Sequence, residues 1–389
     1  MIIVAHTIHP YLFKTGTWIY NQLINDVDIK HVVLTTKTEN LDKFPFQPIY
    51  STEDLTKINE FIQKASRRLL KQCISYWVKS SKKEGVNILH SHFGNIGVEN
   101  MSLAKKLNVP HVVSFYGADF GKVIYHNSKF LNQYKKLFES VSGVFVEGLY
   151  SKKTVINLGC QEEKVYVSHL GVNLASINAI QRCWNGLDPF KILIVGTFTK
   201  KKGIIISLKA IELLIRKHPD IKIEVSLVGD ATNSVESFQT KKEIFEFIER
   251  SPLQKIVKKY GFLSYRKLIE ISYQHHLFMQ LSIFGDDGDC EGGFPVILTD
   301  MMATGMPVIG SDHCDIPEII KHEKNGLIVS QNNIIQAKKA LYNTILNYNL
   351  YASNWYKFNK DYLKQNFDAQ SQAQARKEIY NKILNISHK

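Results

Sequence analysis

The chain has 389 residues, more than one hydrophobic core usually serves, so we expect two domains. Hydrophobic residues make up 44% and charged residues 22%, which excludes a wholly disordered or collagen-like chain, and no apolar run approaches the length of a membrane-spanning helix. The excess of 49 Lys and Arg over 36 Asp and Glu, a net charge of +13, indicates an anionic partner. The five cysteines are scattered without zinc or redox spacing, so we expect reduced thiols and a cytoplasmic protein.

Short β-rich runs alternate with longer amphipathic stretches along the chain. In the first half we expect strands at 2–5, 31–35, 87–90, 111–115, 144–146 and 164–168. In the second half we expect strands at 191–195, 221–228, 256–263, 277–281, 306–310 and 326–329. The alternation predicts an α/β fold with two doubly wound, Rossmann-like domains facing across a cleft, where ligands bind beyond the carboxyl ends of the strands.

The domain boundaries follow from interruptions in this pattern. We place the N-terminal domain at 1–172 and a hinge at 173–190, where Gly and Pro interrupt the alternation. The C-terminal domain then covers 191–350. Residues 351–389 are helical by pattern, with Asp368 as the expected N-cap of the last helix, and we expect these helices to pack back toward the N-terminal domain.

Much of the positive charge of the first half lies in one segment, between Lys57 and Lys83. Eight basic residues stand there against a single acidic one, Glu60: Lys57, Lys64, Arg67, Arg68, Lys71, Lys79, Lys82 and Lys83. Apolar residues recur between them near helical spacing, which predicts a basic amphipathic helix. Such a helix suits an anionic membrane surface. A helix packed on the sheet with a solvated basic face explains the pattern equally well, and we expect the apolar stripe itself to pack on the sheet.

The first candidate for chemistry is the loop VGTFTKKKG at 195–203, between an expected strand and an expected helix. Its glycine permits a sharp turn, its lysines carry positive charge, and the following helix offers free N–H groups to a phosphate. The loop is no Walker A motif, because the Gly-Lys-Ser/Thr ending is absent. An exposed turn with solvated lysines is the alternative.

The second candidate is the acidic, glycine-rich segment DDGDCEGGFP at 286–295, which leads into an expected helix with Pro295 near its start. Amides at that helix start can hold a diphosphate while the carboxylate of Glu291 accepts from a sugar hydroxyl. The alternatives are a capped helix with a solvated acidic loop, or a divalent-metal pair formed by Asp287 and Asp289.

Taken in order, these segments resemble the nucleotide-sugar domain of GT-B glycosyltransferases of the retaining family 4. The resemblance rests on the loop at 195–203, LVGD at 227–230, GFL at 261–263, the block from Glu291 to Ile309, and NGLIV at 325–329. The first half is similar to the family more loosely, through HSHFG at 90–94, SFYGAD at 114–119 and the segment 14–21.

The resemblance implies transfer of a hexosyl or N-acetylhexosaminyl group from a UDP- or GDP-sugar to a lipid-linked or saccharide acceptor, with retention at the anomeric carbon. It implies no cofactor and no metal, and a role in bacterial surface polysaccharide, lipopolysaccharide or glycolipid assembly, with the enzyme peripheral at the inner face of the membrane. The implied catalytic residues are Glu291, Asp119 and Lys202. The implied donor-binding residues are Gly196, Thr197, Lys202, Gly229, Leu263, Glu291, Gly292, Gly293, Phe294, Pro295 and Asp300. The implied acceptor-binding residues are Gly16, Thr17, Tyr116 and His92.

Three positions depart from the family pattern. Thr197 stands where an arginine is usual, so Lys202 carries more of the diphosphate contact. Tyr116 replaces the usual histidine, and Asp300 replaces the second glutamate with one extra residue of spacing. These departures leave open a nucleotide-binding protein without activity. A nucleotide-sugar hydrolase or epimerase and a nucleic-acid-binding protein are further alternatives, although no nucleic-acid-binding motif occurs.

Overall fold

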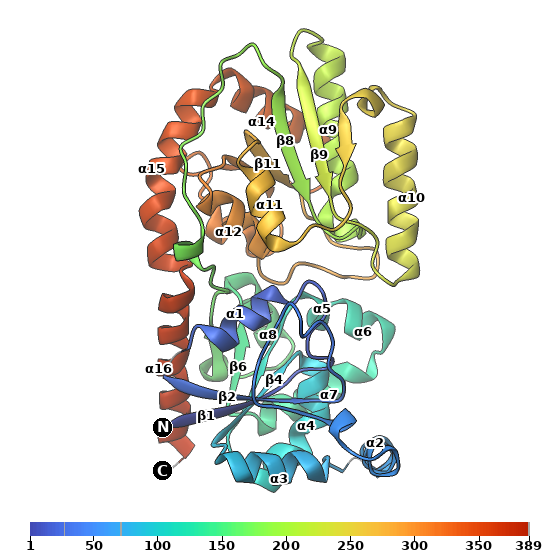
Figure 1. The fold of residues 1–389 in the computed structure, drawn as a ribbon, viewed down its shortest axis with the longest axis vertical. Coiled ribbons are helices and arrows are strands. Elements are labelled where there is room, and N and C mark those ends of the chain that lie inside the picture. The colour runs from blue at the N-terminus through green and yellow to red at the C-terminus, as the bar shows by residue number, and fades with distance from the viewer. Residues whose placement is uncertain (27, 71, 388–389) are drawn as a thin grey trace. The chain divides into compact units, whose positions relative to one another are not determined.

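The computed structural model describes residues 1–389 except 27, 71 and 388–389, so Lys71 of the basic segment lies outside the described residues. The chain forms two compact units (Figure 1). The first comprises Met1–Gly171 and Ala369–Lys389, and the second comprises Val172–Asp368. Each unit contains its own parallel sheet, which confirms the expected α/β class.

The first unit is built on a seven-stranded parallel sheet of order β3-β2-β1-β4-β5-β6-β7. Its strands are β1 (Ile2–Thr7), β2 (Ile29–Thr35), β3 (Ile49–Ser51), β4 (Ile88–His92), β5 (His111–Ser114), β6 (Gly143–Val146) and β7 (Val165–Val167). Every strand expected in this half has a counterpart, and β3 was not expected. The strand order reverses between β1 and β4, which makes that position the topological switch point of the sheet.

Helices cover both faces of the first sheet, which explains why its strands are apolar on both sides. They are α1 (Thr17–Ile24), α2 (Lys57–Leu70), α3 (Ser75–Glu84), α4 (Gly94–Leu107), α5 (Gly117–Phe120), α6 (Lys122–His126), α7 (Lys129–Ser140), α8 (Leu149–Asn157) and α16 (Ala369–Ser387). Tyr380 and Ile383 of α16 pack against Val4 on one face. Trp77 of α3 and Leu103 of α4 belong to the core on the other.

The second unit contains a six-stranded parallel sheet of order β10-β9-β8-β11-β12-β13. Its strands are β8 (Phe190–Val195), β9 (Ile223–Val228), β10 (Val257–Lys259), β11 (Leu277–Gln280), β12 (Val308–Ser311) and β13 (Leu327–Val329). Its helices are α9 (Ile204–Lys217), α10 (Val235–Glu249), α11 (Tyr265–Ser272), α12 (Val296–Ala303), α13 (Ile316–Ile319), α14 (Ile334–Leu346) and α15 (Tyr348–Asn366). The switch point of this sheet lies between β8 and β11.

The unit boundaries differ from the expected domain boundaries in two places. The expected hinge at 173–190 packs on the second unit, where Ile177 joins the core and the buried Arg182 donates to Thr304 Oγ1 at 3.2 Å. The helices expected as one block at 351–389 are divided: Trp355 of α15 lies in the core of the second unit, while α16 belongs to the first. Asp368, the expected N-cap, directly precedes α16.

Candidate active site

The lysine turn of the second unit lies directly after β8, at the switch point of its sheet. Lys200–Lys202 form a short 3₁₀ helix, and Gly203 ends it with φ of 60°. A Cβ on Gly203 would lie 1.7 Å from the carbonyl oxygen of Leu281, so only glycine permits this approach of the turn to the end of β11. A Cβ on Gly196 would lie 3.2 Å from Cγ of Lys202. Gly196 therefore lets the stem of Lys202 pass close to the end of β8.

Lys202 and Glu291 form a close ion pair at this position. Lys202 Nζ lies 3.0 and 2.8 Å from the two carboxylate oxygens of Glu291, and Ser282 Oγ donates to Glu291 Oε1 at 2.8 Å. The side chains of Lys202 and Glu291 are 16% and 6% exposed. Burial by itself would raise the pKa of Glu291, but Lys202 and Lys201 together lower this pKa to about 2. The structure thus brings together an ionised carboxylate and an ammonium group that are far apart in the sequence.

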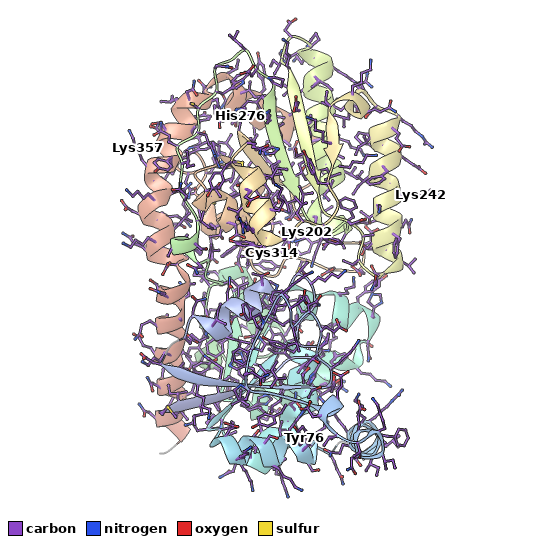
Figure 2. The ribbon with its side chains drawn as sticks, viewed as in Figure 1. Tyr76, Lys202, Lys242, His276, Cys314 and Lys357 are labelled. Atoms are coloured by element: carbon purple, nitrogen blue, oxygen red, sulfur yellow. The ribbon has the colours of Figure 1, made fainter. Side chains whose placement is uncertain are left out.

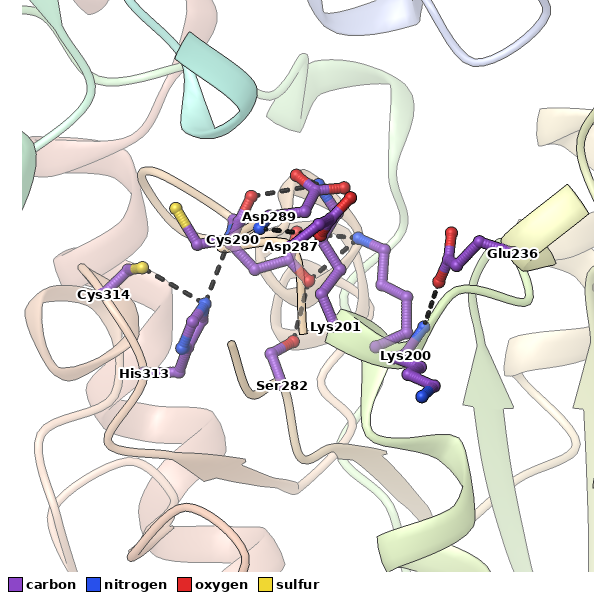
Figure 3. Close-up of polar contacts among 11 residues, drawn as sticks. Lys200, Lys201, Glu236, Ser282, Asp287, Asp289, Cys290, His313 and Cys314 are labelled. Carbon is purple, nitrogen blue, oxygen red and sulfur yellow. Dashed lines mark hydrogen bonds and ion pairs between the residues drawn. The ribbon is translucent and has the colours of Figure 1, made fainter. Parts of the chain in front are cut away.

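The other two lysines of the turn hold the acidic loop that precedes Glu291 (Figure 3). Lys201 Nζ donates to Asp289 Oδ1 and to the carbonyl oxygen of Cys290, both at 3.0 Å. Lys200 pairs with the exposed Asp286. Asp287 Oδ1 accepts from the backbone N–H of Asp289 at 3.1 Å. The carboxylate of Asp289 is thus engaged by an ammonium group, and the suggested metal pair of Asp287 and Asp289 appears here as an ion-paired loop.

His313 supports Glu291 from the loop after β12, and no motif in the sequence assigned it to the site. The backbone N–H of Glu291 donates to His313 Nε2 at 3.2 Å, and His313 Nδ1 lies 3.0 Å from Gln331 Oε1. These partners indicate a neutral ring with its proton on Nδ1, in agreement with burial, which lowers the pKa of His313. Ser282 was missed as well. Both residues follow buried strands directly, so the position of strand ends is the signal that could have found them.

The segment between Glu291 and α12 turns sharply and then enters the core. Gly292 has φ of 78°, and the backbone N–H of Asp315 donates to the carbonyl oxygen of Gly293 at 3.0 Å. Phe294 is 3% exposed and its ring packs on Phe367, so its side chain is not open to a ligand. Pro295 is the N-cap residue of α12, so the helix begins at Val296, one position after the expected start.

Asp300 lies on α12 as a buried carboxyl group with its own partner. Tyr265 of α11 donates its hydroxyl to Asp300 Oδ1 at 2.9 Å. Burial raises the pKa of Asp300 to about 7, although the bond from Tyr265 lowers it. Asp300 is 5% exposed, so the structure pairs this expected donor-binding residue with Tyr265 rather than presenting it at the surface.

Neighbouring strand ends complete the donor-side loops. The backbone N–H of Gly196 donates to Val228 O at 3.0 Å, and that of Gly229 donates to Gly261 O at 2.8 Å. Gly229 has φ of 132°, and a Cβ there would lie 1.8 Å from Gly196 O. Thr197 and Leu263 follow these turns and are half-buried. The ends of β8 and β9 and the loop after β10 therefore meet through backbone groups.

In the first unit, the expected acceptor-binding residues surround an aromatic group at the end of β4. Trp18 and Phe93 pack edge-on against the ring of Tyr116, with centroids 4.4 and 4.9 Å away. Phe93 has φ of 76°, a conformation rarely adopted by a residue with a side chain, and such strain is concentrated at functional sites. Gly16 is the N-cap residue of α1, and Thr17 begins that helix.

His92 and Asp119 are fully buried beneath this aromatic group. His92 Nδ1 lies 2.8 Å from the Tyr116 hydroxyl. Asp119 accepts from the backbone N–H of Gly94 at 2.8 Å and from that of Tyr116 at 2.7 Å, at the starts of α4 and α5. Burial raises the pKa of Asp119 to about 7, although both bonds lower it. The structure thus places Asp119 as a link between two helix starts.

The basic segment forms two helices that differ in what they expose. Trp77 and Val78 of α3 are buried, whereas Ile58, Phe61 and Leu69 of α2 are 74%, 74% and 76% exposed. The expectation that the apolar stripe packs on the sheet is wrong for α2.

The reason is that α2 contacts the unit through polar groups. Arg67 pairs with Glu99 at 2.7 Å and lies over the ring of Trp77, and Gln63 Oε1 accepts from the backbone N–H of Tyr76, a residue labelled in Figure 2. With its polar side turned inward, α2 presents Ile58 and Phe61 to solvent. Among the described residues, no helix combines the length and apolar composition needed to cross a membrane.

Comparison with known proteins finds a family match within the second unit. Residues 184–361 match the family model of glycosyl transferases group 1. The range includes the lysine turn, Glu291 and Asp300.

Curated relatives include the amylovoran biosynthesis glycosyltransferase AmsK of Erwinia amylovora, 27% identical over 66% of this chain and 61% of the relative. The putative colanic acid biosynthesis glycosyltransferase WcaL of Escherichia coli K12 is 26% identical over 69% of this chain and 63% of the relative. The chain therefore spans about three fifths of the length of these relatives.

Solved structures cover both units. A glycosyltransferase from Rickettsia africae superposes with a TM-score of 0.76 at 16% identity and covers 98% of both chains. Anabaena Alr3699/HepE in complex with UDP superposes with a TM-score of 0.77 at 14% identity, over 98% of this chain and 100% of that one. At this identity the likeness establishes the fold, which is GT-B.

Proposed function

We propose that the chain is a retaining glycosyltransferase that moves a sugar from a nucleoside diphosphate sugar to an acceptor hydroxyl. The observation that carries this proposal is the Lys202–Glu291 pair at the switch point of a glycosyl transferases group 1 domain. A departing diphosphate is stabilised by a cation, and the sugar hydroxyls are positioned by a hydrogen-bond acceptor. Relatives named for amylovoran and colanic acid biosynthesis support a role in surface polysaccharide assembly. A neighbour solved with UDP and glucose supports a UDP-sugar, with GDP-sugars as the second class to test.

On the donor side, each group has a chemical task. An ammonium group has three N–H donors, and Lys202 directs two contacts to Glu291, so a third N–H can bind the diphosphate. The amides of Gly293 and Phe294 at the start of α12 add positive dipole. The ionised Glu291 orients the sugar hydroxyls. The remaining donor contacts in this proposal are Gly196, Thr197, Gly229, Leu263, Gly292, Pro295 and Asp300. These fixed positive groups stabilise the leaving diphosphate without requiring a metal ion.

On the acceptor side, we assign the contact surface to Trp18 and Phe93 together with Gly16 and Thr17. Trp18 and Phe93 are half-buried and offer apolar ring surface to a saccharide. Tyr116 and His92 lie behind these rings, and Asp119 orders the helix starts on which Phe93 and Tyr116 lie. In this proposal Asp119 supports the acceptor site without contacting the acceptor.

The donor proposal is tested by thermal unfolding of the purified chain with UDP-glucose, UDP-galactose, UDP-N-acetylglucosamine and GDP-mannose. One donor should raise the melting temperature, since ligand binding to the native state stabilises it. NMR analysis of the product then gives the anomeric configuration. Glu291→Gln should abolish transfer, while Asp286→Asn, in the same loop but exposed, should leave it intact. Full activity of Glu291→Gln would refute the site, and release of free sugar in place of transfer would identify a hydrolase.

We further propose that α2 docks the enzyme on an anionic membrane surface, where a lipid-linked acceptor is held. The exposed stripe of Ile58, Phe61, Ile62 and Leu69 can enter the interface between headgroups and acyl chains. Lys57, Lys64 and Arg68 on the same helix are exposed; Lys57 and Lys64 share the carboxylate of Glu60, and the helix keeps a net positive charge that suits such a surface. This places the enzyme at the inner face of the cell membrane.

Vesicle sedimentation tests the docking proposal. The chain should sediment with phosphatidylglycerol-containing vesicles at low salt and should dissociate at high salt, because salt screens surface charge. Phe61→Ser with Ile58→Ser should abolish sedimentation. Phe238→Ser, which removes a 58% exposed ring from the second unit, is the matched control and should leave it unchanged. Binding that ignores lipid charge and salt would refute this mode of docking.

A further inference from the structure

Three buried histidines on the α16 face of the first sheet form a continuous hydrogen-bonded series: His92, His6 and His31. We propose that this series makes Asp26 and Arg376 positioning residues for the ring of Tyr116 and thereby for the acceptor surface. The inference rests on the proposed function and adds residues that no motif in the sequence connects with it.

The series begins at the Tyr116 hydroxyl and crosses the switch point of the sheet. The hydroxyl lies 2.8 Å from His92 Nδ1. His92 Nε2 lies 3.0 Å from His6 Nδ1, and His6 Nε2 lies 2.8 Å from His31 Nδ1. Each ring nitrogen of His92 and His6 therefore has one partner within the series. Because His92 is on β4, His6 on β1 and His31 on β2, three adjacent strands carry it.

The series ends at a buried ion pair. His31 Nε2 lies 3.5 Å from Asp26 Oδ2, and Arg376 donates to the same oxygen through Nε at 3.3 Å and Nη2 at 3.2 Å. The side chains of Asp26 and Arg376 are 1% and 4% exposed. Arg376 Nη2 also donates to the backbone carbonyl of Gln22 at 3.3 Å. Helix α16 thus holds Asp26 in place, although 350 residues separate the two partners in the chain.

The Asp26 carboxylate accepts from Arg376 and lies 3.5 Å from His31 Nε2, and in this proposal it favours the His31 tautomer that carries its proton on that nitrogen. His31 Nδ1 is then the acceptor for His6 Nε2–H. By the same logic His92 donates from Nε2 and accepts at Nδ1 from the Tyr116 hydroxyl. Burial lowers the pKa of His92 to about 3 and that of His6 well below its usual value, in agreement with neutral rings at these two positions.

A metal site is the competing explanation, since His6, His90 and His92 each have one ring nitrogen within 4.8 Å of those of the other two. The rings of His90 and His92, however, are stacked at 4.6 Å with planes 12° apart. A metal ion lies near the plane of each ring that binds it, so two stacked rings are poorly placed to share one. His90 is also engaged by Tyr380 at 2.6 Å and by Ser114 at 2.7 Å. The hydrogen-bonded series explains the geometry better.

The series has a consequence for the acceptor surface because the Tyr116 ring supports Trp18 and Phe93. A hydroxyl that donates to one fixed nitrogen fixes the ring to which it is attached. When the anchor is removed, the ring and the two aromatic side chains that pack on it lose that constraint. The expected result is a KM for the acceptor raised roughly 10-fold or more, with the donor KM unchanged.

The test combines a structural readout with kinetics. Long-range ¹H–¹⁵N NMR of the histidine rings should show His6, His31 and His92 protonated on Nε2 in the wild type. Asp26→Leu with Arg376→Met removes the buried pair together, which is tolerated better than removing one partner. This double variant should give mixed tautomers and the raised acceptor KM. Arg376→Lys should preserve both readouts. His111→Gln changes a buried histidine of the same sheet that bonds Ser91 Oγ, and it should alter neither readout.

A double-mutant cycle shows whether Tyr116 is the target. Tyr116→Phe should raise the acceptor KM in the wild type and add nothing in the Asp26→Leu/Arg376→Met background. Nδ1 protonation in the wild type, stoichiometric zinc retained on the purified chain, or an unchanged acceptor KM in the double variant would each overturn the inference. If the wild type transfers no sugar at all, the proposed function fails, while the NMR arms still decide whether Asp26 orders the series.

Discussion

Each of the two sheets carries buried polar groups at its switch point, but the two sheets satisfy these groups in different ways. At the β8–β11 switch point of the second sheet, Lys202 and Glu291 are ionised partners. At the β1–β4 switch point of the first, His6 and His92 are neutral rings joined by hydrogen bonds. A site for a charged ligand can hold its charged side chains in ion pairs with one another. A series of neutral rings instead fixes the direction of its hydrogen bonds and the orientation of the side chains that it joins.

The largest expected difference between the two units is in their stability under mild acidification. Burial lowers the pKa of five described histidines in the first unit, His6, His9, His90, His92 and His111, and of three in the second, His275, His276 and His313. Below pH 6.5 these histidines become protonated in the unfolded chain but stay neutral in the folded chain. The free energy of unfolding therefore decreases as the pH is lowered, by up to about 1.4 kcal/mol per pH unit for each ring. The first unit should therefore lose stability faster between pH 6.5 and about 4.

Other titratable groups do not reverse the expected order in which the two units lose stability. Asp119 and Asp300, one in each unit, have a pKa raised to about 7 and favour the folded state at low pH by similar amounts. The Lys202–Glu291 pair keeps its contribution until pH falls below about 4.5 toward 2. Hydrogen exchange at pH 7 and 5.5 would check the prediction, which is refuted if the second unit loses protection first.

Removing one partner of the ion pair should have the next largest effect. Glu291→Ala leaves Lys202 beside a buried cavity without its counter-charge, so we expect a loss of about 3–5 kcal/mol in the free energy of unfolding. Lys202→Met combined with Glu291→Leu should recover most of that loss because no charge is left unpaired. Urea unfolding measures both. A Glu291→Ala variant as stable as the wild type would mean that solvent screens the pair.

A smaller, pH-dependent effect is expected at Asp300. Tyr265→Phe removes the hydroxyl that stabilises the ionised carboxylate, so the loss should be about 1.5–3 kcal/mol at pH 8 and smaller at pH 5, where Asp300 is protonated. Tyr273→Phe is the matched control, since its hydroxyl donates to the backbone carbonyl of Asn178 and its loss should not depend on pH. Urea unfolding at the two pH values decides; equal losses for Tyr265→Phe would show that Asp300 does not titrate in this range.

The smallest effect is expected at Lys200, although it neighbours Lys202 in the same turn. Its partner Asp286 has an 80% exposed side chain, and exposed pairs contribute little. Lys200→Ala should change the unfolding free energy by less than about 1 kcal/mol. A loss as large as that of Glu291→Ala would show that burial makes no difference between the ion pairs of the turn.

Strand periodicity and strand ends were enough to predict most of the fold. Every expected strand occurs, and the residues after β8 and before α12 form the loops predicted for the donor. The division between α15 and α16 was missed because it depends on which core receives Trp355 and which receives Tyr380. Helical pattern alone does not say where a helix packs.

By itself, the sequence determined the α/β class, the two sheets and the loops that carry Lys202 and Glu291, because periodicity and glycine positions are local properties. Only the tertiary structure decided that Glu291 pairs with Lys202, that Asp119 links two helix starts, and that α2 turns its apolar stripe outward. It also joined Asp26 to Arg376, which are 350 residues apart in the sequence. The physical reason is that burial and partner choice depend on which segments meet, and these are set by the packing of whole elements.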